Sequence, residues 1–277
     1  MAGLMVLSGT RRIALWGAED WVASARAGES STVAAGWRAG EKLQDVFPDF
    51  PLLFKVIDTR DRLSVQVHPN ERTAAATGGE PKSEMWCALS DGPIYAGMKP
   101  GVSAEDVERA VKDGSFENLL VRHDARVGDV FYIPGGLVHA IGGGVRLFEV
   151  QQSSDTTYRL YDWGRADADG NPRRLHVDSA LKVMDLSLPP PQPCGSLDTP
   201  YFRFRRETVT GRKTLSPGED FLMAFVASGV IEAAGIKIPE SSCFLLPPGV
   251  ETEISGDGAI LMLTAFSGGS RGCGRKE

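Results

Sequence analysis

The segment Gly128-Asp129-Val130-Phe131-Tyr132-Ile133-Pro134-Gly135-Gly136-Leu137-Val138-His139 decides the fold of this chain. A short apolar run, predicted to be a β-strand, is followed by a turn of proline and glycine and then by a histidine. In the spacing G-x5-P-x-G-x2-H, from Gly128 to His139, the glycine-rich turn bends the chain and a second strand carries the histidine inward. The segment therefore predicts a β-rich unit with an imidazole in its interior.

A second histidine lies in the apolar segment Leu63-Ser64-Val65-Gln66-Val67-His68-Pro69. In a strand, residues i and i+2 point to the same face, so Gln66 and His68 face one way and Val65 and Val67 face the other. A buried amide beside a buried imidazole needs a polar partner, because unpaired polar groups are costly to bury. One cation satisfies both groups, so the segment predicts a metal site.

Composition limits the partners of the chain. Its 277 residues suit two domains or one large all-β unit, with 42% hydrophobic residues to form a core. A net charge of −6 argues against nucleic acid or an anionic membrane as the main partner. A small anionic substrate requires a local basic pocket. The sequence does not determine the oligomeric state.

The cysteines and the N-terminal segment predict a cytoplasmic protein. None of the four cysteines forms a CxxC pair, which indicates reduced thiols rather than a zinc knuckle or a disulfide framework. The N-terminal apolar run is too short for a signal peptide. No stretch approaches the roughly 20 apolar residues of a membrane span.

Turn residues scattered between short apolar runs predict a mainly β fold, with 32 glycines and 17 prolines in the chain. The predicted strands are Leu52–Ile57, Leu63–His68, Glu84–Ala88, Ile94–Met98, Val130–Ile133, Val145–Gln151 and Thr157–Tyr161. One helix is predicted from Ala104 to Lys112, because Ser103 is a good N-cap and Gly114 follows its end. A second helix or turn is predicted over residues 38–46.

Four segments are predicted along the chain. Residues 1–188 form a catalytic domain with the metal site, residues 189–200 a proline-rich linker, residues 201–266 a C-terminal β domain, and residues 267–277 a disordered tail. Residues 131–141 align with residues 244–254, with Thr252 in the place of His139. This repeat predicts two related β-barrels, only the first with a metal site; chance similarity of two strand-turn-strand units is the alternative.

The motif from Gly128 to His139 matches the second half-motif of cupins, which are small double-sheet barrels. Gln66 and His68 stand where a cupin carries its first histidines. From about Trp16 to Arg165 the chain resembles type I mannose-6-phosphate isomerases in their short bacterial form. The resemblance rests on four blocks in order: residues 63–69, Lys82-Ser83-Glu84-Met85-Trp86, residues 128–144, and residues 148–162 from Phe148-Glu149-Val150-Gln151-Gln152 to Tyr161-Asp162. It implies two cupin-type jelly-roll barrels with a short helical segment.

The resemblance also implies one Zn²⁺ per chain, held by Gln66, His68, Glu84 and His139. Two imidazoles and one carboxylate suit zinc, and one carboxylate leaves a net charge of about +1 that keeps the ion electrophilic. The implied activity is the interconversion of mannose 6-phosphate and fructose 6-phosphate through an enediol. The implied partner is therefore a small sugar phosphate. For Gln66 a buried hydrogen-bonding role, and for Glu84 an ordinary carboxylate at a strand end, are the alternatives.

Three further residues are candidates for catalysis. By resemblance Arg159 is the catalytic arginine, whose cationic fork suits an enediolate or a phosphate; an ion pair at the surface is its alternative. Glu149 shares a strand face with Gln151, and we interpret it as a proton-transfer residue or its orienter, or else as a partner of Arg159. Lys82 shares a face with Glu84 and could bind phosphate or assist proton transfer.

Other functions remain open at this stage. An Fe(II) cupin oxygenase needs open coordination positions, which Gln66 as a fourth ligand disfavours. A non-catalytic sugar-binding cupin, or a metal-dependent cupin acting on another sugar, is also possible, although Arg159 and Lys82 argue for catalysis. Relative to the family that the chain resembles, residues 25–31 and the loop 70–81 are shortened. The sequence therefore does not decide which sugar binds or whether a phosphate group is required. The general base and the metal loaded in the cell are likewise undetermined.

Overall fold

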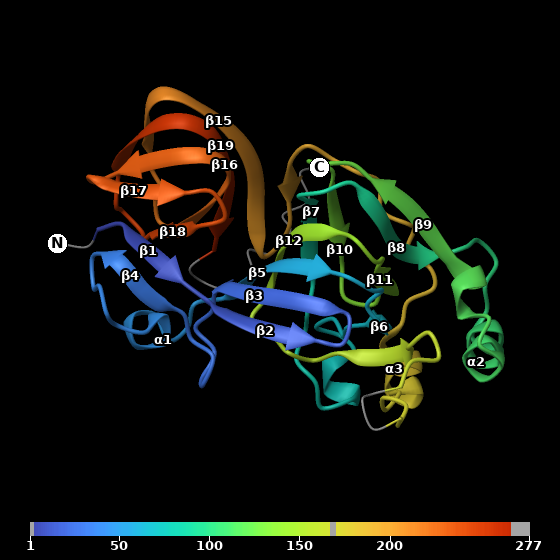
Figure 1. The fold of residues 1–277 in the computed structure, drawn as a ribbon. Coiled ribbons are helices and arrows are strands. Elements are labelled where there is room, and N and C mark those ends of the chain that lie inside the picture. Colours follow the sequence, from blue (N-terminus) through green and yellow to red (C-terminus); the bar gives the residue numbers. More distant parts are fainter. Residues whose placement is uncertain (1–2, 167–169, 267–277) are drawn as a thin grey trace, which may run out of the picture. The chain divides into compact units, whose positions relative to one another are not determined.

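The computed structural model describes residues 3–166 and 170–266, and their fold is mainly β (Figure 1). The predicted disordered tail, residues 267–277, lies outside the described residues. The elements are β1 (Met5–Ser8), β2 (Thr10–Ala14), β3 (Gly17–Ala23), β4 (Thr32–Gly36), α1 (Leu43–Val46), β5 (Leu52–Thr59), β6 (Val65–Val67), η1 (Ala74–Ala76), β7 (Glu84–Ala88), β8 (Gly92–Met98), α2 (Ala104–Asp113), η2 (Phe116–Leu119), β9 (Leu120–Ala125), β10 (Val130–Ile133), β11 (His139–Ile141), β12 (Arg146–Gln152), β13 (Tyr158–Tyr161), α3 (Val177–Val183), β14 (Leu197–Asp198), β15 (Phe202–Leu215), β16 (Phe221–Ala233), β17 (Ile236–Pro239), β18 (Cys243–Leu246) and β19 (Thr252–Ala265).

The strands join three sheets, and the described residues divide into two compact units. The sheet orders are β14-β15-β19-β16-β18-β1-β4 with β17 beside β16, then β10-β7-β12-β5-β3-β2, and β13-β6-β11-β8-β9. Unit 1 comprises residues 3–11, 20–55 and 195–266, and unit 2 comprises residues 12–19 and 56–194. This division differs from the predicted one at the N-terminus, because β1 pairs with β4 and β18 within unit 1. The change of unit after residue 194 falls inside the predicted linker.

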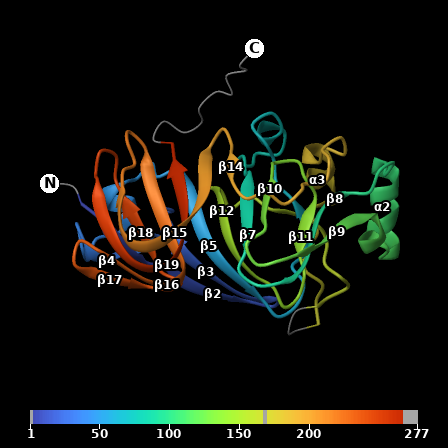
Figure 2. The same cartoon turned by 90° about the horizontal axis from the view of Figure 1, so that it is seen from above.

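Unit 2 holds its core between two layers of strands. In Figure 2, β7, β10 and β12 form one layer, while β8, β9 and β11 form the other. Large apolar side chains from both layers meet in one cluster, among them Trp86, Phe131, Ile94 and Ile141. Fully burying such a side chain contributes about 1.5–3 kcal/mol. The layers are therefore held together by the alternate, inward-facing residues of each strand.

Two helices cover the outer face of the five-stranded sheet of unit 2. Ser103 caps α2 through a capping box with Asp106, and Gly114 ends it with φ 78°, a left-handed conformation that glycine adopts easily. Val107 of α2 packs in the same apolar cluster as Val65 and Val67 of β6. Helix α3 lies against β13 and β6. The outer face of β6 is thus apolar, which leaves its polar residues for the interior.

Each predicted strand corresponds to a strand of the structure, and the predicted helix 104–112 is confirmed as α2. Within the predicted helix or turn 38–46, only Leu43–Val46 is helical. Helix α3 was not predicted, because its N-cap is His176 and no side chain caps it. Strand β9 was not predicted either, since three polar residues, Arg122, His123 and Asp124, occupy its middle.

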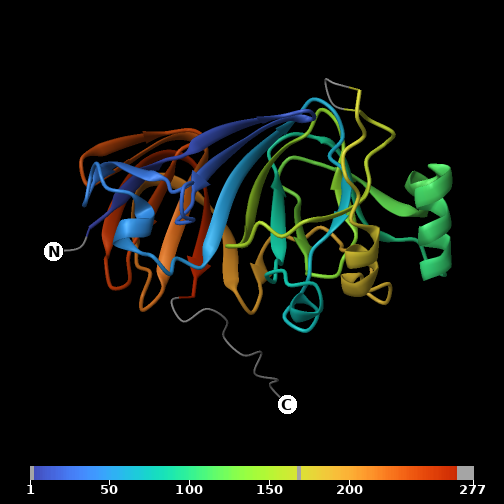
Figure 3. The ribbon, with the colours of Figure 1, turned by 90° about the horizontal axis from the view of Figure 1, so that it is seen from below.

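In unit 1 the three long strands β15, β16 and β19, orange to red in Figure 3, are hydrogen-bonded neighbours in the order β15-β19-β16. Their apolar residues form a separate core with Phe244 and Leu246 of β18. Strand β18, a turn and β19 repeat the order of β10, a turn and β11. Thr252 is the first residue of β19, as His139 is the first of β11. The aligned segments therefore share a strand-turn-strand form. That the chain contains two related β-barrels stays a prediction.

Candidate metal centre

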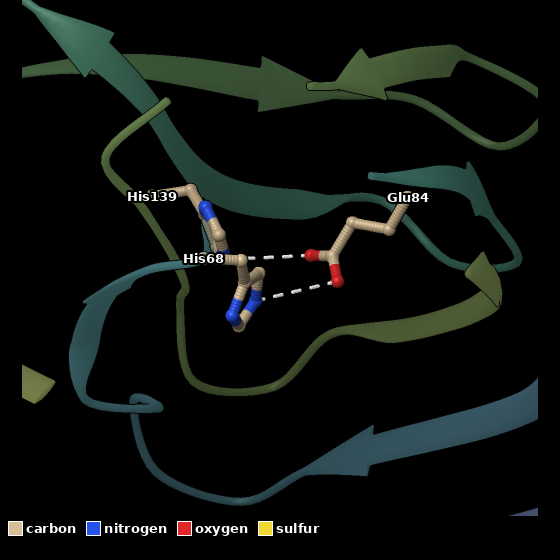
Figure 4. Close-up of side chains that lie close together, drawn as sticks. All are labelled: His68, Glu84 and His139. Carbon is tan, nitrogen blue, oxygen red and sulfur yellow. Dashed lines mark ion pairs between the residues drawn. The ribbon is translucent and has the colours of Figure 1, made fainter. Parts of the chain in front are cut away.

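Three buried donors converge from three strands of unit 2. His68 follows the last residue of β6, Glu84 is the first residue of β7, and His139 is the first of β11. Their exposed fractions are 1%, 0% and 1%. Nε2 of His68 lies 3.5 Å from Oε2 of Glu84, and Nε2 of His139 lies 3.3 Å from Oε1. Figure 4 marks both contacts with dashed lines. The described residues contain one such group of three donors that could hold a metal ion.

Backbone carbonyls fix which nitrogen of each imidazole faces the centre. Nδ1 of His68 lies 2.8 Å from the carbonyl oxygen of Thr156, and Nδ1 of His139 lies 2.8 Å from that of Leu137. A carbonyl only accepts hydrogen bonds, so each Nδ1 donates and carries the ring proton. In the neutral ring, Nε2 then presents its lone pair to Glu84. This second contact is how proteins usually orient an imidazole that binds a metal.

Burial keeps both histidines neutral, while the charge of Lys82 keeps the buried glutamate ionised. Burial, helped by the ammonium of Lys82, lowers the pKa of His68 from 6.5 to about 3. Burial also lowers the pKa of His139. For Glu84, burial alone raises the pKa, but the positive charge of Lys82, together with the interactions of the two neighbouring imidazoles, outweighs it and holds the pKa well below its usual value. The centre therefore combines two nitrogen lone pairs with a carboxylate at neutral pH.

This donor set fits a divalent cation. Both side-chain oxygens of Glu84 are buried and receive no hydrogen bond of regular geometry from the described residues, although the ammonium of Lys82 lies 3.2 Å from Oε2 as an ion-pair partner. A buried carboxylate in that state is costly, and a lone pair of His68 or His139 beside it adds repulsion. One cation among the three residues removes both penalties. Two imidazole nitrogens and a carboxylate are ligands that zinc commonly takes.

Gln66 lies at the edge of the same centre. It pairs with His139 across the sheet, and its Nε2 is 3.3 Å from Nε2 of His139. The oxygen and nitrogen of an amide exchange places when the group rotates by half a turn. Such a rotation turns the carbonyl oxygen of Gln66 toward the ring nitrogen of His139. The alternation predicted for β6 is confirmed, because Val65 and Val67 pack on the opposite, apolar side.

Lys82 reaches the centre from the loop before β7. Its side chain is buried, and Nζ lies 3.1 Å from Nε2 of His68 and 3.2 Å from Oε2 of Glu84. Lys82 thus lies beside Glu84 as expected, but through a loop contact and not through the shared strand face that the sequence spacing suggested. The ammonium thus places a positive charge beside the carboxylate of Glu84 and the lone pair of His68.

Glu149 contacts Trp86, which in turn packs against His139 of the centre. Trp86 and Glu149 face each other across β7 and β12, and Nε1 of Trp86 donates to Oε2 of Glu149 at 2.9 Å. The ring of Trp86 meets the ring of His139 edge-on, with centroids 5.3 Å apart. Glu149 is 4% exposed. The carboxylate is thus held in the interior, one side chain away from a candidate ligand.

Arg159 lies beside Gln66 in the sheet, but its guanidinium is directed to a neighbouring segment. The two residues pair between β13 and β6, so their side chains share the inner face. One guanidinium nitrogen of Arg159 donates to the carbonyl oxygen of Arg174 at 2.9 Å. Burial and the charge of Arg173 lower the pKa of Arg159, although a guanidinium stays protonated at neutral pH. The structure places Arg159 next to the centre without a direct contact to its three donors.

Sequence reasoning missed the residues that orient the centre. The carbonyls of Thr156 and Leu137 leave no signature in a sequence, because every residue has one. Trp86 lay within a quoted block but had no assigned role. The other two histidines are outside this group of donors and contact backbone groups: Nε2 of His123 lies 3.2 Å from the carbonyl oxygen of Ala96, and Nδ1 of His176 accepts from the amide of Arg159.

Comparison with known proteins gives the family. The sequence model "Phosphomannose isomerase type I, catalytic domain" matches residues 31–85. The chain is 32% identical over 237 residues to the mannose-6-phosphate isomerase of Streptococcus mutans, a match that covers 76% of this chain and 75% of that protein. The chain belongs to the type I mannose-6-phosphate isomerase family. This confirms the resemblance stated from the sequence and the expectation of an isomerase.

Solved structures of the family share the fold. The crystal structure of the mannose 6-phosphate isomerase from Bacillus subtilis matches with a TM-score of 0.84 and 24% identity, covering 94% of this chain and 99% of that chain. A zinc-bound mannose 6-phosphate isomerase matches with a TM-score of 0.73 and 14% identity, covering 96% of this chain and 100% of that chain. The mainly β, cupin-type fold is therefore confirmed. Within residues 3–166 and 170–266, no helix has the length and apolar character needed to span a membrane.

Proposed function

We propose that this protein is a zinc-dependent isomerase that interconverts mannose 6-phosphate and fructose 6-phosphate through an enediol. The observation that carries the proposal is the buried convergence of His68, Glu84 and His139, with two lone pairs and an ionised carboxylate directed at one another. The family relationship supplies the reaction and the substrate class. Lys82 and Arg159 beside the centre supply the positive charge that an anionic sugar requires.

His68, Glu84, His139 and Gln66 would hold the zinc ion, with Gln66 contributing its amide oxygen. The ion supplies Lewis-acid chemistry, which stabilises negative charge on a neighbouring oxygen. The carbonyls of Thr156 and Leu137 keep both imidazoles in the required tautomer.

The protein's residues provide the proton transfers. In the forward direction the C2–H bond of the open-chain aldose breaks, its electron pair forms the C1=C2 bond of the enediol, and O1 takes up a proton. A C1–H bond then forms as O2 loses its proton. Glu149 accepts the C2 proton or orients the group that does, because it is buried and held in place by Trp86. General acid–base catalysis of this kind contributes about 10²–10⁴-fold.

Lys82 and Arg159 bind and stabilise the anionic parts of the substrate. The ammonium of Lys82 can donate a proton to a sugar oxygen at the centre, because it already lies within 3.2 Å of Glu84. Arg159 presents a permanent cationic fork on the same inner face as Gln66, suited to an enediolate or a phosphate. This arrangement favours an isomerase over a cupin that only binds sugar, since binding alone does not require a buried lysine beside the metal ligands.

One experiment tests the proposal. Purified protein is analysed for bound metal, and the interconversion of hexose 6-phosphates is assayed with zinc, after chelation and after zinc is restored. We expect isomerisation of mannose 6-phosphate that is lost on chelation and recovered with zinc. Absence of isomerisation with every hexose 6-phosphate at full zinc occupancy would falsify the proposed function. Comparing mannose with its 6-phosphate in the same assay measures how far the phosphate is required.

A further inference from the structure

Gln151, on the inner face of β12, is a buried polar side chain beside Glu84 of β7. Gln151 pairs with Glu84 across β7 and β12, so the two side chains point to the same face. Gln151 has an exposed fraction of 0%. Ile133 pairs with Glu84 from the other side and has no polar atom in its side chain. The position therefore combines complete burial with the neighbourhood of the candidate metal centre.

Two backbone carbonyls fix the orientation of the Gln151 amide. Nε2 donates to the carbonyl oxygen of Gln152 at 3.1 Å and to that of Ser154 at 2.6 Å. Exchange of the amide oxygen and nitrogen would place an oxygen against both carbonyls, which only accept hydrogen bonds. The direction of Oε1 is thus determined by its surroundings.

Oε1 of Gln151 is buried and has no hydrogen-bond donor among the described residues. A buried acceptor in this state costs free energy, and natural proteins rarely keep one without a use. The amide is neutral, so the missing partner is a neutral or weakly acidic donor rather than a phosphate or a carboxylate. An acyclic sugar carries such donors on successive carbons.

We propose that Oε1 of Gln151 accepts a hydrogen bond from a hydroxyl of the open-chain substrate, at a carbon beyond the reacting C1 and C2. Neighbouring strands lie about 4.8 Å apart, which is the span of a few carbon atoms of an extended sugar. A sugar whose reacting end lies at the centre by Glu84 thus brings a later hydroxyl over β12. Gln151 is then a residue that sets sugar specificity; the inference rests on the proposed function.

The test uses zinc-loaded protein, the variant Gln151→Met and the control Gln44→Met. Gln44 also has a buried Oε1 without a donor among the described residues, but it lies on α1 in unit 1. Binding of hexitol 6-phosphate, an unreactive acyclic analogue, is measured by calorimetry. We expect Gln151→Met to raise its Kd and the KM of mannose 6-phosphate about tenfold, a change equivalent to about 1.4 kcal/mol, with little change in kcat. Gln44→Met should match the wild type.

Deoxy analogues of the hexitol 6-phosphate identify the hydroxyl. The wild type should bind one of the 3-, 4- or 5-deoxy compounds about tenfold more weakly than the parent, and Gln151→Met should bind that compound and the parent alike. The inference is overturned if the wild type binds all of them equally, whatever the variant does. It is also overturned if Gln151→Met discriminates among them as the wild type does while mannose 6-phosphate is still isomerised. A wild type that isomerises no hexose 6-phosphate instead overturns the proposed function.

Discussion

The ammonium of Lys82 competes with any cation held by the centre, because it lies 3.1 Å from Nε2 of His68 and 3.2 Å from Oε2 of Glu84. Repulsion between charges a few ångströms apart in a buried site amounts to about 4 kcal/mol per pair of unit charges. We expect Lys82→Met to tighten zinc binding at least tenfold while lowering kcat by about 10²–10⁴-fold. Dialysis against a zinc buffer and steady-state assays measure the two effects. Lys82→Arg keeps the charge and serves as control; weaker zinc binding in Lys82→Met would contradict this role.

A variant of Arg159 should change activity without changing zinc binding, because its guanidinium donates to the carbonyl oxygen of Arg174 and does not contact the three donors. We expect Arg159→Ala to lower kcat/KM by at least about 10²-fold, because a preorganised positive charge is lost. The zinc content should stay at the wild-type level, as elemental analysis would show. Arg159→Lys restores the charge without the planar fork and should recover part of the activity. Loss of zinc in Arg159→Ala would show that the residue supports the metal site instead.

The depressed pKa values of the histidines predict how the metal-free protein responds to acid. In the unfolded chain His68 takes up a proton near pH 6.5, but in the folded chain only near pH 3. The unfolded state therefore binds more protons between these values, and stability present above pH 6.5 is lost as the pH falls. For His68 alone the free energy of unfolding should fall by about 1.4 kcal/mol per pH unit below 6.5. Urea unfolding from pH 7.5 to 5 measures this slope.

The variant His68→Gln is the control for the pH series. It removes one titrating group, so its stability should depend less steeply on pH than that of the wild type. His139 contributes in the same direction, because its pKa is also lowered by burial. An identical slope in wild type and His68→Gln would mean that His68 is protonated in the folded, metal-free protein.

At the scale of single elements, α2 owes part of its stability to the capping box of Ser103 and Asp106. The hydroxyl of Ser103 accepts from the amide of Asp106, whose carboxylate accepts from the amide of Ser103. We expect Ser103→Ala to lower the free energy of unfolding by about 1 kcal/mol, a typical value for an N-cap. Thermal unfolding measures the loss, and kcat and KM should stay unchanged because α2 covers the outer face. Ser103→Asp, another good cap, should restore the stability.

Local signals in the sequence predicted the elements that carry them. Ser103 and Gly114 marked both ends of α2, and Pro134 with Gly136 marked the turn that leads to His139. Elements without such signals were missed: α3 has no side-chain cap, and β9 is polar in its middle. The pairing of β1 with β18 joins residues more than two hundred positions apart, which no single-sequence pattern reveals.

Within the site, the alternation of β6 predicted that Gln66 and His68 share a face, and the cupin-like motif predicted the inward direction of His139. The inclusion of Glu84 and Lys82 came from family resemblance, since nothing in their local pattern places them near a histidine. The contacts of the backbone carbonyls of Thr156 and Leu137 depend on tertiary structure alone. For the same reason the unpaired oxygen of Gln151 could be found only once its partners were located.

At the scale of the molecule, bound zinc should stabilise the folded state, because the unfolded chain lacks a preformed site. Zinc at one hundred times its Kd contributes about 2.7 kcal/mol. We expect the thermal midpoint of chelated protein to rise when zinc is added, as calorimetry can record. Glu84→Gln removes the charged ligand and should abolish most of the shift, whereas Ser103→Ala should keep it. A shift of the same size in Glu84→Gln would place the stabilising metal elsewhere.

The discontinuous make-up of unit 1 has a consequence for synthesis on the ribosome. Residues 12–19 and 56–194, which form unit 2, have all been translated before β15 appears. Strand β1 pairs with β18 from Met5↔Leu245 to Leu7↔Cys243, so one of its edges stays unpaired until more than two hundred further codons after β4 have been translated. An open strand edge is prone to join other chains. The nascent polypeptide therefore passes through a stage in which all residues of unit 2 have been made while β1 of unit 1 still has one unpaired edge.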